Sequence, residues 1–227
     1  WPHVLDKNKF DPVDDQLAAR MHKAIAIMQF KLEGQLIKEH PEFDLDKRLL
    51  LDKIDFENGT VNVEGTVYPL NDTFFPTIDP NNPYELTEDE RAVMNSLSAS
   101  IINSERLQTH IRYMFSHGAL YKRINGNLLF HGCIPMDENG DFLPVDIYGA
   151  KCAGRALMDH LDKQIRASYF SPEKIKKYGK PGDLMWYLWL AKDSPLFGKE
   201  KMTTFERLFI DDKASHKEHV RPYYKLI

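Results

Sequence analysis

The stretch that organises the chain is Gly126-Asn-Leu-Leu-Phe-His131-Gly132-Cys133-Ile-Pro135. Its apolar run, Leu128 to Phe130, predicts a short buried strand that ends at a His-Gly pair. Gly132 permits a sharp turn and a close approach of another backbone segment. At the end of a central strand, where open α/β sheets bind ligands, the His131 imidazole could bind a divalent metal. A strand-end histidine that only hydrogen-bonds to a backbone carbonyl is the alternative, and the motif alone favours it.

Composition narrows the class of protein. The 227 residues suit one large domain or one and a half, and 42% hydrophobic residues suffice for a core. The net charge of -4 predicts neither a nucleic-acid partner nor an anionic membrane surface. No apolar run approaches the roughly 18 residues that span a bilayer. Two cysteines are too few for a disulfide framework and predict a cytoplasmic location, and a start at Trp1 predicts a piece of a longer protein.

Residues 1–48 predict a long helix with its flanks. Asp11-Pro12 suits an N-cap followed by proline at the first helical position. Beyond it, apolar residues recur every three or four positions until Pro41, so a helix is expected over Asp14–Glu39. The stripe, which we expect to pack in the core, consists of Leu17, Met21, Ile25, Met28, Leu32 and Leu36.

Residues 49–86 predict a β-hairpin insertion followed by a Pro-rich loop. Alternating apolar residues flank Asn58-Gly59, and Asn-Gly between such runs is the strongest short hairpin signal. Three prolines between Asn71 and Pro83 then indicate a loop.

Residues 87–227 predict a partial core that contains the His-Gly motif. A capping box at Thr87–Glu90 begins a second long helix, Glu88–His117, whose apolar phase slips near Asn103-Ser104. The expected elements after the motif are a strand within Phe142–Ile147, a helix over Gly154–Tyr169 and a final helix from Thr203. His216 and His219 could share one face of that last segment. The fold class is therefore α+β: mostly helical, with a hairpin and a few short strands whose sheet other segments would complete.

Three segments together resemble a known family. The stretch Asn127 to Pro135 resembles the His-Gly metal motif of the calcineurin-like metallophosphatases. Asp183-Leu-Met-Trp186, with Asp193-Ser-Pro195 after it, is similar to the Asp-Leu-Leu-Trp…Asp-Pro segment of the phosphoprotein phosphatase branch. The wider sequence looks like the middle of the longer class III fructose-1,6-bisphosphatases of Gram-positive and related bacteria, through Phe30–Gln35, Phe75–Asp79, Tyr121–Pro135 and Ser194–Lys199.

This resemblance implies a fold, a site and a reaction. The chain would form part of a four-layer α/β/β/α metallophosphatase fold, with His131 as one ligand of a two-metal manganese site. The reaction would be hydrolysis of the 1-phosphate of fructose 1,6-bisphosphate, a sugar bisphosphate, to fructose 6-phosphate in gluconeogenesis. A hydroxide that bridges the two metals would attack the phosphorus.

The departures from the family pattern also matter. The Gly-Asp-x-His, Gly-Asp-x-x-Asp-Arg, Gly-Asn-His-Asp and closing Gly-His motifs are absent, and Cys133 replaces the second glycine of His-Gly-Gly. The catalytic residues and the other metal ligands therefore remain unknown from this sequence. We expect this chain alone to be inactive and to bind manganese weakly or not at all.

Two alternatives stay open. One is a metallophosphatase that acts on another substrate class, such as a phosphoprotein. The other is a non-catalytic helical module for oligomerisation or effector sensing, in which Asp14–Glu39 and Glu88–His117 present faces to a partner. Unpaired strand edges also make a homo-oligomer plausible.

Overall fold

The computed structural model describes residues 14–217. Its helices and strands, in chain order, are α1 (Asp15–Glu39), β1 (Ile54–Asp55), β2 (Thr60–Val63), β3 (Thr66–Pro69), α2 (Glu88–Ile102), α3 (Glu105–His117), β4 (Tyr121–Ile124), β5 (Asn127–Phe130), β6 (Val145–Ile147), β7 (Ala150–Cys152), α4 (Gly154–Phe170), α5 (Asp183–Leu190) and α6 (Thr204–Phe209). Short 3-10 turns lie between several of them. The predicted α+β class is confirmed. The division at residues 48 and 86 and the four-layer fold stay predictions.

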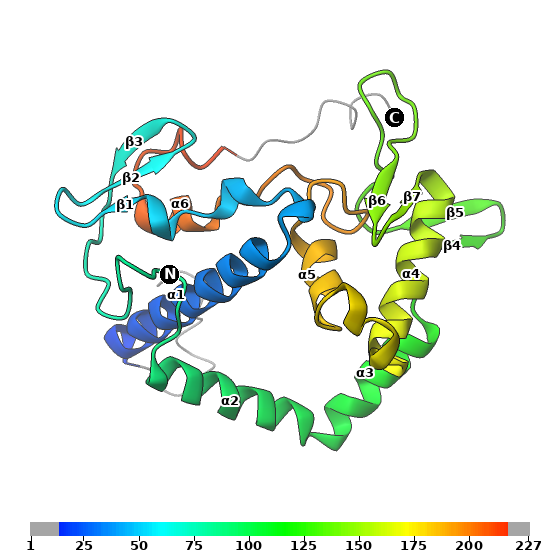
Figure 1. Ribbon diagram of the computed structural model, residues 1–227, viewed down its shortest axis with the longest axis horizontal. Coiled ribbons are helices and arrows are strands. Elements are labelled where there is room, and N and C mark those ends of the chain that lie inside the picture. Colours follow the sequence, from blue (N-terminus) through cyan, green and yellow to red (C-terminus); the bar gives the residue numbers. More distant parts are fainter. Residues whose placement is uncertain (1–13, 218–227) are drawn as a thin grey trace.

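Two groups of elements lie on either side of α1 and α5 in Figure 1. The three-stranded antiparallel sheet β1-β2-β3 and α6 form one group. The two-stranded pairs β4-β5 and β6-β7 with α4 form the other. Helices α2 and α3 run along the lower edge of the picture and connect the two groups.

Helix α1 agrees with the predicted helix over Asp14–Glu39 except in how it begins. The carboxylate of Asp14 accepts hydrogen bonds from the backbone N–H groups of Gln16 and Leu17, so Asp14 is the N-cap. Asp11-Pro12, the cap that the sequence predicted, lies outside the described residues. The apolar stripe is buried only over its second half, because Leu17, Met21 and Ile25 are about half exposed.

The predicted hairpin at Asn58-Gly59 is confirmed and continues into a third strand. Ile54 pairs with Val61, and Val61 pairs in turn with Tyr68. Gly59 has φ +64°, a left-handed conformation that glycine adopts without strain.

The second predicted helix is two helices. The capping box is present, with Thr87 and Glu90 each accepting the other's backbone N–H. Helix α2 ends at Ile102, and Ser104 caps α3, so the break falls where the apolar phase slips. Helix α2 buries only Glu90, and α3 buries no residue completely.

The strand before the His-Gly pair exists, but the predicted burial is wrong. β5 pairs only with β4 within residues 14–217, in a hairpin closed by Asn125 and Gly126, both with positive φ. Leu128 is 46% exposed and Phe130 40%. Among the described residues β4 is the only strand that pairs with β5, and the strand is therefore left at the surface.

The second half of the chain follows the predicted helices closely. Helix α4 ends one residue beyond the predicted Tyr169, and α6 begins at Thr204. The expected strand within Phe142–Ile147 is shorter, because only Val145–Ile147 pairs with β7 while Phe142 forms an isolated bridge. Of the two histidines three apart, His219 lies outside the described residues, so a shared face stays a prediction.

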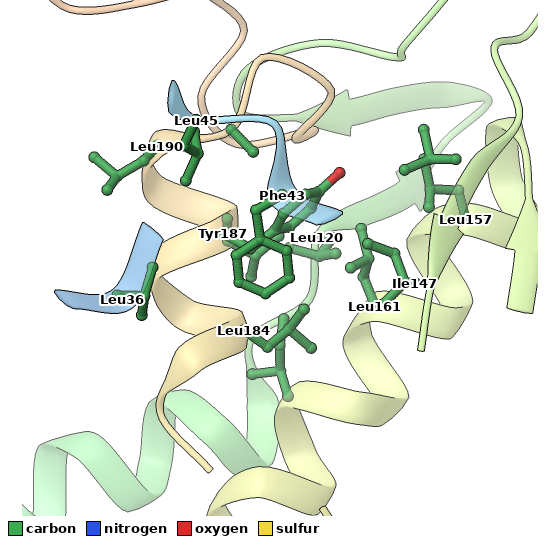
Figure 2. Packing of buried hydrophobic residues seen from close by; sticks show 14 of the residues in the cluster. Leu36, Phe43, Leu45, Leu120, Ile147, Leu157, Leu161, Leu184, Tyr187 and Leu190 are labelled. Atoms are coloured by element: carbon green, nitrogen blue, oxygen red, sulfur yellow. The ribbon is translucent and has the colours of Figure 1, made fainter. Parts of the chain in front are cut away.

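The core has two parts, and α1 contributes to both. One part packs Ile27 and Phe30 of α1 against β1–β3 and α6. The other packs Leu36 and Ile37 of α1 against α4, α5 and β6, and Figure 2 shows Phe43 and Tyr187 at its centre. Leu49 packs against both parts. A single helix therefore sets the position of one half of the described chain relative to the other.

One buried ion pair fixes α2 to α1. The Lys31 ammonium is completely buried and donates to the Glu90 carboxylate at 2.7 Å and to the carbonyl of Thr77 at 2.5 Å. The same Glu90 carboxylate accepts the backbone N–H of Thr87. A buried charge needs this number of partners to offset its desolvation.

Removal of one partner should therefore be costly. We expect Lys31→Ala to lower the free energy of unfolding by about 3–5 kcal/mol, since the buried Glu90 carboxylate loses its counter-charge. Urea denaturation followed by circular dichroism measures this. Arg91→Ala, which breaks the exposed pair with Glu85, is the matched control and should cost less than about 1 kcal/mol. Equal effects from both substitutions would mean that the Lys31 pair is as solvated as a surface pair.

Candidate functional site

His131 immediately follows β5 and lies on the surface. Its Nδ1 lies 3.0 Å from the carbonyl oxygen of Leu196. A carbonyl only accepts, so Nδ1 carries a proton, and in a neutral ring with this tautomer Nε2 has the lone pair. This is the arrangement in which a histidine binds a metal through Nε2 while a backbone carbonyl orients the ring. The backbone-carbonyl hydrogen bond of the alternative interpretation is therefore present, and the role of His131 as a metal ligand stays a prediction.

The turn after His131 packs directly on the segment 194–196. A Cβ atom on Gly132 would lie 2.5 Å from the carbonyl oxygen of Pro195 and 2.6 Å from that of Leu196. The Cys133 N–H donates to the Pro195 carbonyl at 2.8 Å. The close backbone approach that the sequence predicted at Gly132 is confirmed, and its partner is the Ser-Pro-Leu segment.

Ser194 holds this segment against the end of α5. Its side chain is completely buried, and its hydroxyl donates to the carbonyl of Leu188 at 2.5 Å. The same hydroxyl accepts the backbone N–H of Leu196 at 3.1 Å. A continuous set of contacts therefore leads from α5 through Ser194 to the carbonyl that orients His131.

A largely apolar cleft lies beside His131. Its volume is about 710 Å³. The residues that line it are His131, Met185, Trp186, Leu188, Trp189, Leu196, Phe197, Lys199 and Met202. Trp186 and Trp189 stack with ring centroids 5.8 Å apart, and Trp189 is 58% exposed. His131 and Lys199 are the polar members of this lining, as expected of a site in which few polar groups orient a ligand.

The part of the chain that the structure describes holds one group of three side chains close enough to share a metal ion, and it does not include His131. This group is Glu39, His40 and Asp183, whose ligand atoms lie within 4.8 Å of one another. Its atoms already have partners. His40 Nδ1 contacts Glu42 and Nε2 contacts Asp183, both at 2.8 Å, while the Lys180 ammonium binds both carboxylate oxygens of Glu39. We interpret the group as an ion-pair network that joins the end of α1 to the start of α5.

The network raises the pKa of His40. Burial alone lowers the pKa of this imidazole, but hydrogen bonds to the Glu42 and Asp183 carboxylates outweigh it and raise the pKa above its ordinary 6.5. The backbone N–H of Lys180 also donates to Asp183 at 2.7 Å. Nearby, burial and then the same two carboxylates raise the pKa of Tyr148 to about 12.

The sequence predicted a site at His131 and did not predict this network. His40 and Asp183 lie 143 positions apart, and no local pattern connects them. The signal that could have found them is weak: a histidine at the end of a helix, and an acidic residue before the most aromatic stretch of the chain. The structure does not bring His131 together with His40 or His216. His216 instead bonds to the carbonyls of Glu206 and Ile210.

No described helix combines the length and the apolar character that a membrane crossing requires.

The fold and the His-Gly turn define an α+β protein that presents a strand-end histidine at an apolar cleft. A family model described as Firmicute fructose-1,6-bisphosphatase matches residues 1–227, and the chain belongs to this family. It is 54% identical over 225 residues to the fructose-1,6-bisphosphatase class 3 of Clostridium tetani. The matched stretch covers 98% of this chain and 34% of the length of that relative.

Two further relatives carry the same name. The Clostridium acetobutylicum protein is 52% identical over 223 residues, covering 98% of this chain and 34% of its own length. The protein of Clostridium botulinum strain Okra is 52% identical over 227 residues. The matched stretch covers 99% of this chain and 33% of the length of that protein. The chain thus spans about a third of the length of these relatives. No solved structure matches it significantly.

The contact at Gly132 should be intolerant of a side chain. We expect Gly132→Ala to lower the free energy of unfolding by about 1–3 kcal/mol, because the new methyl group forces the turn away from Pro195. Tryptophan fluorescence during urea denaturation reports both the stability and the surroundings of Trp186 and Trp189. Gly182→Ala is the matched control, because no atom lies within 4 Å of the added methyl group. It should lower the free energy of unfolding by less than about 1 kcal/mol. An unchanged spectrum and stability for Gly132→Ala would contradict the contact.

The His40 network should make stability depend on pH. Because the pKa of His40 is raised in the folded state, its contribution is fully present below about 6.5 and is lost as pH rises through the folded pKa. We therefore expect His40→Gln to lower the free energy of unfolding more at pH 6 than at pH 9. The control is His117→Gln on exposed α3. In this variant the free energy of unfolding should differ between pH 6 and pH 9 by the same amount as in the parent chain. A cost of His40→Gln that is the same at both pH values would argue against a charged His40.

Proposed function

We propose that this chain is the central part of a metal-dependent fructose-1,6-bisphosphatase that removes the 1-phosphate of fructose 1,6-bisphosphate. The observation that carries the proposal is identity above 50% over almost the whole chain to relatives that bear this enzyme's name. The free Nε2 of His131 at the edge of a cleft supports it, since the resemblance makes that nitrogen a metal ligand.

The residues present fit one ligand of a metal centre. Nδ1 of His131 donates to Leu196, so the ring is held in the tautomer and orientation that a metal ligand needs. Buried Ser194 and the Gly132 contact keep that carbonyl in place. Divalent ions, which we propose to be manganese, supply Lewis-acid chemistry for phosphate-ester hydrolysis when bound. One histidine cannot hold two ions, so the remaining ligands and the catalytic acid would come from elsewhere in a longer protein.

Several finer features are part of the same proposal. The protein would belong to the calcineurin-like metallophosphatases and act in gluconeogenesis in the cytoplasm, with neither nucleic acid nor membrane as a partner. A homo-oligomer would form through the exposed apolar stripes of α1 and α2.

A chimera tests the proposal. In it, this chain replaces the matching third of the Clostridium tetani protein. With Mn²⁺ it should release phosphate from fructose 1,6-bisphosphate, whereas this chain alone should not. His131→Ala should lower kcat/KM by more than about 10–100-fold, the loss typical of residues that only support a metal ligand. Calorimetry should show a matching loss of Mn²⁺ affinity.

His117→Ala on exposed α3 is the control and should keep full activity. If the His131→Ala chimera binds Mn²⁺ and turns over normally, His131 is not a ligand. If the chimera acts on phosphoproteins and not on the sugar bisphosphate, the substrate proposal is wrong.

A further inference from the structure

Helices α2 and α3 are exposed along almost their whole length. Helix α2 has 15 residues and buries only Glu90, while α3 has 13 residues and buries none completely. Helices of this length are marginally stable in water, and most of their stability in proteins comes from packing of one face. A partner that covers the pair would therefore stabilise it.

Both ends of the helix pair are fixed to the rest of the molecule. Lys31 of α1 holds the start of α2 through the Glu90 carboxylate. Arg166 of α4 donates to the carbonyls of Phe115 and Gly118 at the end of α3. In Figure 1 the two helices run along the lower edge between these attachments. The exposed face is thus held in place before a partner binds, which lowers the entropy lost on binding.

One side of α2 carries a row of apolar side chains. Val93, Leu97 and Ile101 follow one another at intervals of four residues, which places them on one face of the helix. They are 46%, 47% and 48% exposed. No residue from Ala92 to Ile102 is charged. An exposed apolar row without charges is typical of a surface that contacts another protein.

The start of α2 is acidic. Glu88 and Asp89 are both exposed in its first turn. The other two charged residues of the helix are already paired, Glu90 with Lys31 and Arg91 with a glutamate of the preceding loop. Negative charge therefore lies at one end of the apolar row.

The segment beyond the row is basic. Helix α3 carries exposed Arg106 and Arg112 against one acidic residue, Glu105. The helix pair is thus negative at its start, uncharged in the middle and positive beyond. A surface of this kind is complementary to its own copy in the antiparallel orientation, because each acidic end then meets a basic end.

The same features disfavour an anionic membrane as the partner. Helices that lie on such membranes are rich in lysine and arginine on their polar face. The single basic residue of α2, Arg91, is bound to Glu85. Two antiparallel copies of α2 also bring the positive end of each helix dipole near the negative end of the other.

We propose that α2 packs against α2 of a second copy of this chain, antiparallel and across a two-fold axis that passes near Leu97. Leu97 then meets Leu97 of the other copy, and Val93 meets Ile101. The acidic start of each α2 lies beside Arg106 of the other copy. The inference rests on the homo-oligomer of the proposed function, to which it gives an interface, and is independent of the reaction.

Sedimentation equilibrium of this chain tests the interface. Its mass should rise from 26.4 kDa to twice that value at concentrations up to about 1 mM. Leu97→Asp should raise the dissociation constant of the dimer at least about 30-fold, as expected for a residue at the centre of an interface. Val67→Asp, at an exposed valine of β3, is the matched control and should leave it unchanged. A parent chain that stays monomeric, or an equal effect of both substitutions, would overturn the proposal.

Exchange of the charged ends tests the orientation. One variant carries Glu88→Arg with Asp89→Arg, and the other carries Arg106→Glu. Each alone places like charges opposite one another and should weaken association at least about 5-fold. An equal mixture of the two should associate as tightly as the parent chain, because opposite charges then meet at both ends. If the mixture associates no better than either variant, the antiparallel arrangement is wrong.

A cross-link tests the position of the axis without a new charge. A residue on a two-fold axis meets its own copy, so Leu97→Cys should form a disulfide-linked dimer on mild oxidation. Non-reducing electrophoresis measures this. Val67→Cys is the control, and the parent chain accounts for Cys133 and Cys152; both should run as monomers. A Leu97→Cys chain that also runs as a monomer would refute the axis near Leu97.

The chimera separates this inference from the proposed reaction. An active chimera that is monomeric refutes the inference and leaves the reaction untouched. A chimera that is dimeric through α2 but inactive does the reverse. If Leu97→Asp lowers the Tm of a monomeric chimera, the longer protein itself covers α2, which also refutes the inference.

Discussion

The candidate site depends on one backbone contact, between Gly132 and the carbonyls of Pro195 and Leu196. The two segments are more than sixty residues apart, and no side chain lies between them. Because glycine lacks a Cβ, the Leu196 carbonyl comes near enough to accept from His131. The orientation of the histidine is therefore set by backbone, which substitutions at the surface alter little. Ser194 extends this constraint to α5, and the His40–Asp183 pair extends it to α1.

Helix α1 holds the rest of the structure together. It contributes to both parts of the core, and two buried polar contacts join it to other helices: Lys31 with Glu90 of α2, and His40, which follows the helix, with Asp183 of α5. Apolar packing holds α1 against the core. Packing of an apolar helix face alone, however, allows the helix to shift along its axis or to rotate by a small amount. Buried charges tolerate neither, since a small displacement leaves one of them without its partner. The ion pairs thus define the position of α1 along its axis.

The sequence predicted local structure well where the signal lay in neighbouring residues. The Asn58-Gly59 turn and the Thr87–Glu90 capping box depend on backbone geometry within a few positions, and both are present. The break after Ile102 was not predicted, since the slip in apolar phase was interpreted as lying within one helix. Burial was predicted less well. The apolar composition of Leu128–Phe130 predicted a buried strand, yet within residues 14–217 these side chains are 40–53% exposed. The same holds for Leu17, Met21 and Ile25 of α1. The His40–Asp183 network escaped prediction for a different reason, since it joins residues whose proximity only the fold determines.

The mismatch between composition and exposure is itself informative. A helix or strand that faces water typically carries polar or charged residues on its outer side, and a contiguous exposed apolar patch is the informative exception. β5 has no charged residue, α2 has none from Ala92 to Ile102, and the cleft beside His131 has one lysine. The deviation at β5 also surrounds the residue that the family resemblance makes a metal ligand. His131 is oriented by buried Ser194 and by the Gly132 contact, and it lies where the exposed strand β5 meets the apolar cleft. A ligand that bound at this histidine would therefore also contact apolar side chains.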